Sequence, residues 1–326
     1  MDEFQFIQSV TPKFYRQPNV MKGIGDDAAI IRNQHEDTIL TVDTMVDMIH
    51  FSLKTTKPYH VGYRALAANI SDIAAMGGKP TSFLVSIVIP DDWQDQQLNE
   101  IYQGMKDLAK NFQMDLIGGD TVSGKQLTLT ITVIGSVPPQ GRARYRSQAK
   151  QGDIVFVTGT LGDSACGLHI LLHGNENEHD NYEYFIKRHQ MPMPRVDFVQ
   201  ACQGITRMAL NDISDGIANE ANEIALASNQ LIELDYNKIP CQSDLYHFSE
   251  ADRSKWILSG GEDFELIGTI PANEWDILRK VAKETNTKIS QIGVVKNNPE
   301  KNGSVWIYQH DRYAKLNKSG YTHLSR

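Results

Sequence analysis

The alternation of strand-like and helix-like segments along the chain constrains the fold most. Residues 126–137, QLTLTITVIGSV, alternate Leu, Ile and Val with Thr, which is typical of a strand with one buried face. Residues 60–78 read instead as a helix closed by two glycines, because glycine commonly ends a helix. Both halves alternate in this way, so the sequence predicts an α/β (α+β) protein of two domains.

Other segments follow the same two patterns. In the first half we expect strands at 38–43, 81–90 and 114–120 and a helix at 97–112. A Pro/Gly/basic connector at 138–153 marks the boundary between an amino-terminal domain, 1–138, and a carboxy-terminal domain, 139–326. In the second half we expect a strand that enters a turn over 153–162, followed by a helix at 163–174 and a polar loop at 175–181. Further along we expect a helix at 195–210, a turn at 211–216, a helix at 217–228, and strand, turn and strand over 254–270.

Charge and cysteine content exclude several classes of protein. The chain carries 32 Lys and Arg against 40 Asp and Glu, a net charge of −8, so no basic surplus exists for a general nucleic-acid partner. No apolar run approaches the roughly 20 residues of a membrane helix, and the first residues do not read as a signal peptide. The three cysteines are far apart, which is typical of buried, inert thiols. We expect a cytoplasmic protein.

Three short motifs resemble ligand loops of other proteins but fit them poorly. Residues 23–30, GIGDDAAI, have the spacing of a dinucleotide loop, yet the next residues read as a strand where a helix is required. Residues 119–125, GDTVSGK, resemble a phosphate loop, but Gln126 replaces the magnesium-binding hydroxyl, so we expect a hairpin turn with Lys125 exposed. Residues 91–95, DDWQD, lack the glycine and glutamate of a calcium loop and should begin a helix.

Aspartates recur beside glycines at the ends of apolar segments. One more, Asp72, interrupts a helical face of small apolar residues, where a carboxylate needs a strong partner. A helix cap or a turn explains each aspartate taken alone. Two carboxylates about 4 Å apart repel by roughly 4 kcal/mol at an effective dielectric constant near 20, so a converging set requires cations. The aspartates at segment ends are Asp26, Asp27, Asp43, Asp120, Asp212 and Asp215.

The ligand chemistry of this set favours magnesium. Hard oxygen ligands without His or Cys partners suit Mg²⁺ better than zinc, and Mg²⁺ held by carboxylates and water commonly binds a polyphosphate. In the opening loop, at least one of Asp26 and Asp27 would then hold metal, and the metal would hold phosphate.

Glycines and arginines offer further contacts for an anion. Gly118–Gly119 and Gly260–Gly261 would let backbone N–H groups approach a phosphate closely. In the connector, Arg142, Arg144 and Arg146 are either guanidinium forks for phosphate or solvated linker side chains.

Six sequence blocks occur in an order that is typical of one family. They are GIGDDAAI, TVDTMVDMIHF, ANISDIAAMGGKP, LIGGDTVSG, NDISDG and SGGEDFEL, followed near the end by KSGYTHL. A chain with these blocks resembles the thiamine-monophosphate kinase family, within the ATP-binding superfamily of aminoimidazole ribonucleotide synthetase and selenophosphate synthetase. The resemblance implies ATP- and Mg²⁺-dependent phosphorylation of thiamine monophosphate to thiamine diphosphate. It also implies a two-domain α/β fold and a homodimer formed mainly by the amino-terminal sheets.

The same resemblance assigns roles to individual residues. Val42 stands where the family often has a hydroxyl residue, so a metal contact there is limited to its carbonyl. A monovalent cation such as K⁺ is a further candidate ion. The implied metal ligands are Asp26, Thr41, Val42, Asp43, Asp72, Asp120, Asp212 and Asp215; the ATP-binding residues are Tyr102, Gly119, Asp120, Arg146 and Ser214; the residues that contact thiamine monophosphate are His50, Glu262 and Tyr321.

We expect direct in-line transfer without a phosphorylated protein residue, His50 and His189 included. A phosphate monoester dianion is already a competent nucleophile, so positioning and charge neutralisation suffice. Two alternatives stay open: another synthetase of the superfamily, and a non-catalytic nucleotide- or metal-binding protein. Selenophosphate synthesis would need a reactive cysteine near the start, whereas the first cysteine is Cys166.

Overall fold

Two compact units make up the chain. The computed structural model divides into Met1–Ile73 with Gly78–Arg142 and Ala74–Gly77 with Ala143–Arg326. The first unit ends at Arg142 and Ala74–Gly77 belong to the second unit, whereas the predicted domains were 1–138 and 139–326. The structure describes residues 12–22, 30–31, 36–138 and 143–320, with the backbone alone at 21–22, 30–31 and 176–178.

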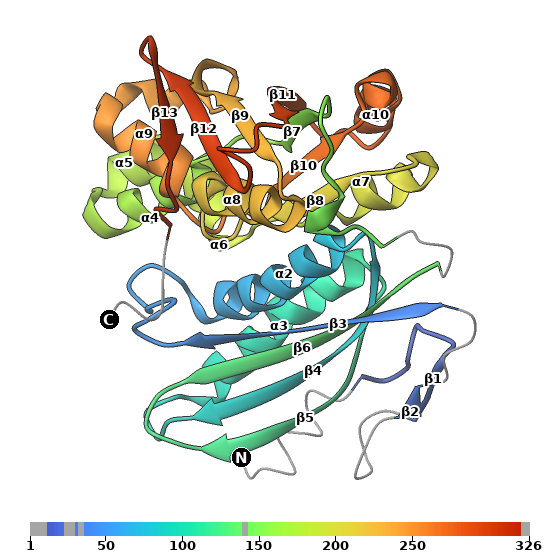
Figure 1. The fold of residues 1–326 in the computed structure, drawn as a ribbon. Helices are drawn as coiled ribbons and strands as arrows, with labels where there is room; N and C mark the ends of the chain where they lie inside the picture. Colours follow the sequence, from blue (N-terminus) through green and yellow to red (C-terminus); the bar gives the residue numbers. More distant parts are fainter. Residues whose placement is uncertain (1–11, 23–29, 32–35, 139–142, 321–326) are drawn as a thin grey trace. The chain divides into compact units, whose positions relative to one another are not determined.

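The first unit is built around a four-stranded sheet in the order β3-β6-β4-β5 (Figure 1). Of the expected elements, the strand at 38–43 and the helices at 60–78 and 97–112 form close to their predicted bounds. The elements of this unit are β1 (Val20–Lys22), β2 (Ile30–Ile31), β3 (Asp37–Val46), α2 (Pro58–Ala75), β4 (Lys79–Ile89), α3 (Asp95–Asn111), β5 (Asp115–Ser123) and β6 (Thr128–Val137).

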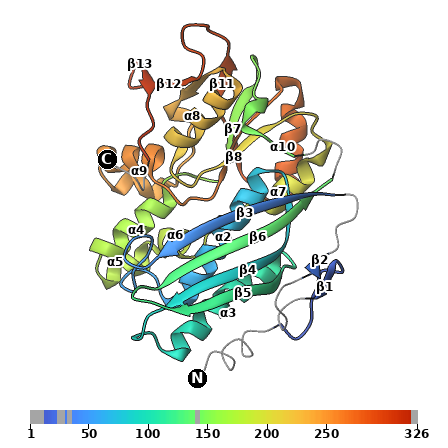
Figure 2. The ribbon, with the colours of Figure 1, turned by 60° about the horizontal axis from the view of Figure 1, so that its bottom comes forward.

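One face of this sheet is covered by helices and the other is not. Along β6, buried residues alternate with half-buried ones, as the Leu/Ile/Val–Thr pattern predicts. Figures 1 and 2 show α2 and α3 on one side of the sheet. On the opposite side Leu40, Val42 and Val122 are 67%, 59% and 47% exposed. No helix among the described residues covers this second side, which we call the open face; it also carries Thr44 and Ser86.

The second unit is built around a seven-stranded mixed sheet in the order β13-β12-β9-β11-β7-β10-β8. Its strands are β7 (Ile154–Thr158), β8 (Ala209–Asp212), β9 (Leu231–Asp235), β10 (Leu266–Ile270), β11 (Ile289–Lys296), β12 (Ser304–Gln309) and β13 (Arg312–Leu316). Its helices are α4 (Asp163–His173), α5 (Glu176–Asn181), α6 (Glu183–Gln190), α7 (Val196–Ala201), α8 (Ile217–Ser228), α9 (Glu250–Ser259) and α10 (Trp275–Glu284).

Strand β7 shows how helices cover both faces of this second sheet. All five of its residues are buried, which is typical of a strand covered on both sides. Val155 belongs to the same apolar cluster as Ile217 of α8. Phe156 points the other way, and its ring centroid lies 6.4 Å from those of Phe198 in α7 and Trp275 in α10. The result is a three-layer arrangement with the core on either side of β7.

Residues 254–259 are helical, whereas the sequence predicted a strand there. They belong to α9, which begins after Ser249, whose hydroxyl accepts a hydrogen bond from the Asp252 N–H at 3.1 Å. Acidic residues in the first turn suit the positive end of the helix dipole. The apolar run that suggested a strand is the buried side of this helix, around Trp256 and Ile257. The prediction was therefore wrong for this segment and correct for β10.

Two further predictions in the second unit were wrong. The polar stretch 175–181 contains the short helix α5 rather than a loop. The helix expected over 195–210 ends at Ala201, and β8 begins at Ala209. Gly204 and the β-branched residues after it have low helix propensity, which explains the early end.

The connection around Lys125 is not a hairpin. Lys125 is exposed, as expected, and lies between β5 and β6. However, β4 lies between these two strands in the sheet and pairs with both. The sequence cannot distinguish a hairpin from a connection that passes over a neighbouring strand, because both need a short polar turn.

The cysteines lead to a simple prediction. Cys166 and Cys202 are fully buried, and burial raises the pKa of each thiol to about 12. Cys241 is half-buried. At about pH 8, a thiol reagent should therefore modify only Cys241 in the native protein and all three cysteines after denaturation. Rapid modification of Cys166 or Cys202 in the native protein, detected by mass spectrometry, would contradict this burial.

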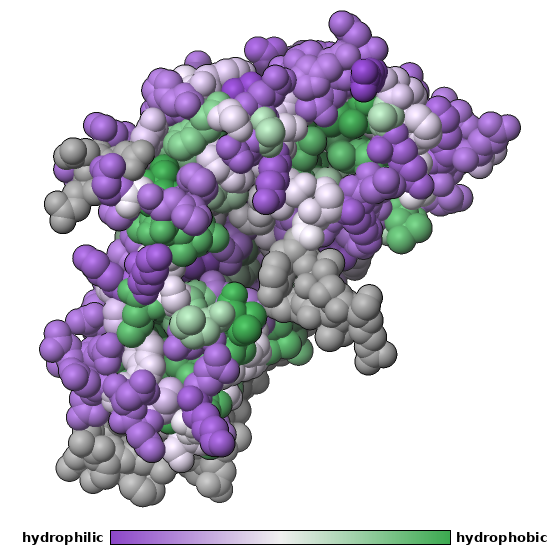
Figure 3. Space-filling view, turned by 90° about the vertical axis from the view of Figure 1, so that its left-hand side faces the viewer, coloured by the Kyte–Doolittle hydropathy of each residue, from purple (hydrophilic) through white to green (hydrophobic). Residues whose placement is uncertain are grey.

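The surface is largely polar on the side drawn in Figure 3, with apolar areas between hydrophilic ones. In the part of the chain that the structure describes, no helix is both long and apolar enough to cross a membrane.

Candidate active site

Thr41, Asp43 and Asp72 form one acidic group in the first unit. Thr41 and Asp43 point to the helix-covered face of β3, because their cross-strand partners on β6 are fully buried. Val42 points to the open face between them. The Thr41 hydroxyl donates to Asp72 Oδ2 of α2 at 2.5 Å, and Asp72 also shares a hydrogen bond with Asp43. The aspartate that interrupts the apolar stripe of α2 thus has its partners on β3.

The chemistry of this group fits a bound divalent cation. Burial raises the pKa of Asp43 above its ordinary value, while the hydrogen bond with Asp72 and the nearby His50 oppose the rise. Two carboxylates that share a hydrogen bond need a proton or a cation between them. With the Thr41 hydroxyl beside them, the side-chain ligands of this group are hard oxygens, which suits Mg²⁺.

A tight turn after β3 fixes His50. Its Nδ1 accepts a hydrogen bond from the Val46 N–H at 3.0 Å, and the His50 N–H donates to the Val46 carbonyl at 2.9 Å. An accepting Nδ1 leaves the proton of the neutral ring on Nε2, which can donate to an anion. Met48 in this turn has a φ of 62°, and such left-handed conformations of non-glycine residues cluster at functional sites.

Asp120 lies apart from this acidic group. In the sheet register Asp43 is level with Gly119, whereas Asp120 is level with Thr44. Successive residues of a strand point to opposite faces, so Asp120 lies on the open face and Asp43 on the helix-covered face. β3 and β5 are also opposite edges of the sheet, three strand spacings or about 14 Å apart. Within one chain, these two carboxylates cannot bind the same ion.

The paired glycines before Asp120 serve the sheet itself. β5 runs through Gly118 and Gly119 and ends at Ser123, three residues after the end that the sequence predicted. A Cβ on Gly119 would lie 2.0 Å from the Val85 carbonyl oxygen of β4, so no larger residue fits there.

Tyr102 of α3 lines a cavity of about 420 Å³ in the first unit. Lys13, Arg16 and Lys106 place cationic groups around it. Burial raises the pKa of Tyr102 above its ordinary value, so its hydroxyl stays protonated and can donate a hydrogen bond. An aromatic and aliphatic wall with cations at its rim suits a flat ligand that carries negative charge. The apolar lining includes Phe14, Phe83, Met105, Ala109, Met114 and Leu116.

In the second unit, Asp212, Ser214 and Asp215 occupy the end of β8 and the turn into α8. The Glu262 N–H donates to the Ser214 carbonyl at 2.7 Å, which joins this turn to the loop before β10. A Cβ on Gly261 would lie 2.4 Å from the Ser214 carbonyl oxygen, so glycine permits the close approach. The turns of NDISDG and SGGEDFEL therefore lie against each other. This contact brings together the four predicted site residues Asp212, Ser214, Asp215 and Glu262.

A polar chain that sequence reasoning missed lies behind Asp215. Arg146 Nε donates to Asn211 Oδ1 at 2.9 Å, and Asn211 donates in turn to Glu220. Glu220 also accepts a hydrogen bond from the Asp215 N–H at 3.3 Å. Burial raises the pKa of Glu220 to about 7. In the sequence, Glu220 looks like any acidic residue in the first turn of a helix. The only sequence feature that could have indicated this polar chain is the position of Asn211 next to Asp212.

Arg144 is neither a phosphate fork nor a solvated linker residue. It is buried, and its Nη2 donates to the carbonyls of Cys202 at 3.0 Å and Ile205 at 3.1 Å. Arg144 therefore anchors the connector within the second unit.

Several predicted residues lie outside the described part of the chain: Asp26, Asp27, Arg142 and Tyr321. The described tail ends at Gly320, whose N–H donates to Asn219 Oδ1 of α8 at 3.1 Å.

The predicted carboxylates fall into separate groups among the described residues. Asp43 lies with Asp72, Asp120 lies on the open face, and Asp212 and Asp215 lie in the second unit. Within the described ranges, no three or more His, Cys, Asp or Glu side chains are close enough to hold a metal ion together.

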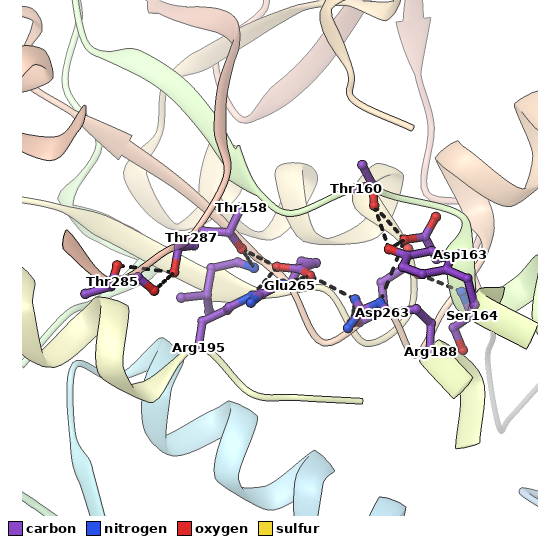
Figure 4. A network of polar contacts seen from close by, with 12 residues as sticks. Thr158, Thr160, Asp163, Ser164, Arg188, Arg195, Asp263, Glu265, Thr285 and Thr287 are labelled. Carbon is purple, nitrogen blue, oxygen red and sulfur yellow. Dashed lines mark hydrogen bonds and ion pairs between the residues drawn. The ribbon is translucent and has the colours of Figure 1, made fainter. Parts of the chain in front are cut away.

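The largest feature missed by sequence reasoning is a buried charged network around Asp263 and Glu265 (Figure 4). Asp163, Arg188 and Arg195 complete it from three other segments. Burial, with the neighbouring Asp163 charge, raises the pKa of Asp263 to about 8. No local sequence pattern signals such a network, because its members are far apart in the chain.

Comparison with known proteins identifies the family. Residues 25–137 match the model of the AIR synthase related protein N-terminal domain, and residues 150–305 match that of the C-terminal domain. The curated thiamine-monophosphate kinase of Bacillus subtilis (strain 168) is 46% identical over 329 residues, which cover 99% of this chain and 100% of that protein. The chain belongs to the thiamine-monophosphate kinase family.

Solved structures agree with this assignment. The thiamine-monophosphate kinase from Stenotrophomonas maltophilia K279a is 29% identical, covers 93% of this chain and 94% of its own, and superposes with a TM-score of 0.82. AaThiL complexed with AMPPCP and TMP is also 29% identical, with a TM-score of 0.78 and coverage of 93% and 92%. The predicted kinase family, enzyme class and two-domain α/β fold are confirmed.

Proposed function

We propose that this chain transfers the γ-phosphoryl group of ATP to thiamine monophosphate and forms thiamine diphosphate and ADP. The observation that carries the proposal is the full-length identity of 46% to a thiamine-monophosphate kinase. A related structure that contains AMPPCP and TMP supports the choice of both substrates. Use of ATP is also consistent with the cytoplasmic location expected from the sequence.

The reaction needs no protein nucleophile. A phosphate oxygen of thiamine monophosphate attacks the γ-phosphorus, the bond from that phosphorus to the β–γ bridging oxygen breaks, and ADP leaves. In this scheme the protein positions the two phosphates in line and compensates their charge. His50 and His189 stay unmodified throughout.

Magnesium ions would be held by the carboxylates that require cations. In the first unit we assign Asp43, Asp72 and the Thr41 hydroxyl, with the Val42 carbonyl and Asp26. In the second unit we assign Asp212 and Asp215. When bound, Mg²⁺ would neutralise the triphosphate and orient it. K⁺ is a further candidate ion.

The nucleotide and the acceptor would use different groups of side chains. We assign the cavity beside Tyr102 to the adenine end of ATP, because it combines an aromatic wall with cations. Gly119, Asp120, Arg146 and Ser214 would border the rest of ATP. The acceptor would contact the Nε2–H of His50, the carboxylate of Glu262, and Tyr321.

The open face is our candidate surface for a homodimer. It exposes apolar side chains on a sheet that is covered on its other side, and such faces are commonly buried by a second element. Two open faces packed together would place Asp120 of one chain against the second chain. Asp120 could then serve the partner's nucleotide site, although it cannot reach Asp43 of its own chain.

Val42→Lys should disrupt such a dimer, because it places a charge on the open face, where the Val42 side chain is 59% exposed. We expect the variant to sediment as a monomer and to lose activity. Leu226→Lys is the matched control, since Leu226 is 62% exposed in α8 of the second unit. A wild-type chain that sediments as a monomer, or a dimeric Val42→Lys variant, would argue against this surface.

Chromatography of the products tests the proposed reaction directly. Purified protein with ATP, Mg²⁺ and thiamine monophosphate should yield equal amounts of thiamine diphosphate and ADP. ATP consumption only with an amidine precursor would indicate a synthetase of the superfamily. Nucleotide binding without any product would indicate a non-catalytic protein.

A further inference from the structure

A buried carboxylate is clamped by two arginines next to the turn that carries Glu262. Glu265 accepts hydrogen bonds from Arg188 Nη2 at 2.8 Å, Arg195 Nε at 2.6 Å and the Thr158 hydroxyl at 2.6 Å. The Glu265 side chain is 1% exposed. Figure 4 shows it between the two guanidinium groups. The position of Glu265 in the core is therefore fixed from three directions.

Arg188 also holds the main chain of the same turn. Its Nη2 donates to the Asp263 carbonyl at 2.9 Å, and its Nε lies 3.7 Å from Asp163 Oδ2. The Asp263 carboxylate accepts hydrogen bonds from the backbone N–H groups of Gly162 at 2.7 Å and Ser164 at 3.0 Å. Asp263 is thus fixed at both its backbone and its side chain.

The turn that these contacts hold is strained. Glu262 has a φ of 65° and Phe264 a φ of 48°, although neither is glycine. Such left-handed residues cost on the order of 1–3 kcal/mol each and persist only where the surroundings enforce them. Asp263 between them is buried, whereas the Glu262 side chain is 31% exposed. The network therefore holds a conformation in which Asp263 points inward and the partly exposed Glu262 side chain lies beside His189, with its Oε2 3.8 Å from His189 Nδ1.

We propose that Arg188 and Arg195 are positioning residues that orient Glu262 toward the cationic thiazolium ring of thiamine monophosphate. The inference rests on the proposed function, in which Glu262 contacts the acceptor. A carboxylate complements a positively charged ring better than it complements a phosphate. Stability alone does not account for the network, because buried ion pairs are often no more stabilising than apolar side chains of equal volume. Neither arginine needs to touch the substrate.

Steady-state kinetics of Arg188→Met tests the inference. We expect KM for thiamine monophosphate to rise about tenfold while KM for ATP stays within about twofold. Arg188→Lys should give a smaller rise, because the ammonium group retains the charge beside Glu265 but loses the fork that also reaches the Asp263 carbonyl. If Arg188→Met fails to fold, Glu265→Gln replaces it, with the same expected rise.

Arg207→Met is the matched control. Arg207 forms two hydrogen bonds with Asp153, at 2.6 and 2.7 Å, elsewhere in the second unit. Its loss should lower the unfolding temperature and leave both KM values unchanged. An unchanged KM for thiamine monophosphate in the Arg188 or Glu265 variants, or an equal rise in Arg207→Met, overturns the positioning role. A wild-type chain that forms no thiamine diphosphate overturns the proposed function and this inference together.

Discussion

Asp212→Asn should lower kcat about a thousandfold and leave the fold intact. Asp212 ends β8, is 4% exposed and lies in the turn that Asp215 and Ser214 share. Asparagine keeps the size of the side chain and removes the charge that we assign to a metal ion. Neutralising a transferring phosphate with metal is worth several kcal/mol, and about 4 kcal/mol corresponds to a factor of about 10³. Quenched-flow or chromatographic turnover measurements at saturating substrates give kcat directly.

The control for this variant is Asp153→Asn. Asp153 is also a buried aspartate of the second unit, 2% exposed, but it pairs with Arg207 and has no assigned role in the reaction. It should lose thermal stability and retain kcat. If Asp212→Asn turns over at the wild-type rate, Asp212 is not a metal ligand. Asp120→Ala should likewise abolish turnover if the open face forms the dimer.

Gly104→Ala should destabilise the first unit by about 3 kcal/mol or more, at the upper end of overpacking effects. A Cβ at position 104 would lie 1.9 Å from the Tyr59 carbonyl oxygen, and one at Gly62 would lie 1.8 Å from the Ile101 carbonyl oxygen. The backbones of α2 and α3 therefore touch at two glycines. We expect a fall of about 6–12 °C in the unfolding temperature, measured by calorimetry. Activity should fall as well, because α2 carries Asp72.

The direction in which Gly104→Ala changes the free energy of unfolding distinguishes backbone contact between the helices from helix propensity alone. Helix propensity alone predicts that replacing an interior glycine by alanine stabilises a helix by about 1 kcal/mol. Gly204→Ala is the control, because no atom lies within 4 Å of its added Cβ. A Gly104→Ala variant as stable as wild type would show that α2 and α3 are not in backbone contact.

Periodicity explains which parts of the fold could be predicted. The alternation in β6 and the small apolar stripe of α2 reflect burial on one face, which local sequence records directly. The strand predicted at 254–259 failed for the same reason, because a short apolar run fits one side of a helix equally well. The order of strands in a sheet depends on contacts between distant parts of the chain. The local sequence therefore could not show that β4 lies between β5 and β6.

The grouping of the acidic side chains depends on information that the sequence lacks. The face on which Asp120 lies is set by strand pairing, and a shift of one residue would move it to the other face. The pairing of β5 with β4 contains such an irregularity between Phe83 and Leu84. The sequence did indicate that Asp72 needs a strong partner, because it interrupts an apolar face, but it did not show that Thr41 and Asp43 are the partners. The hydrogen bonds of Arg188 and Arg195 with Glu265 could not be predicted from the sequence, because Arg188, for example, is 77 residues away from Glu265 in the chain.

A crystal structure with Mg²⁺, a non-hydrolysable ATP analogue and thiamine monophosphate tests the central claim most directly. The account predicts magnesium ions within about 2.0–2.1 Å of oxygens of Asp43, Asp72 and Asp212, each ion also bound to the triphosphate. It also predicts that Asp120 near those phosphates comes from the second chain. A triphosphate bound away from these carboxylates, with no ion on them, would contradict it.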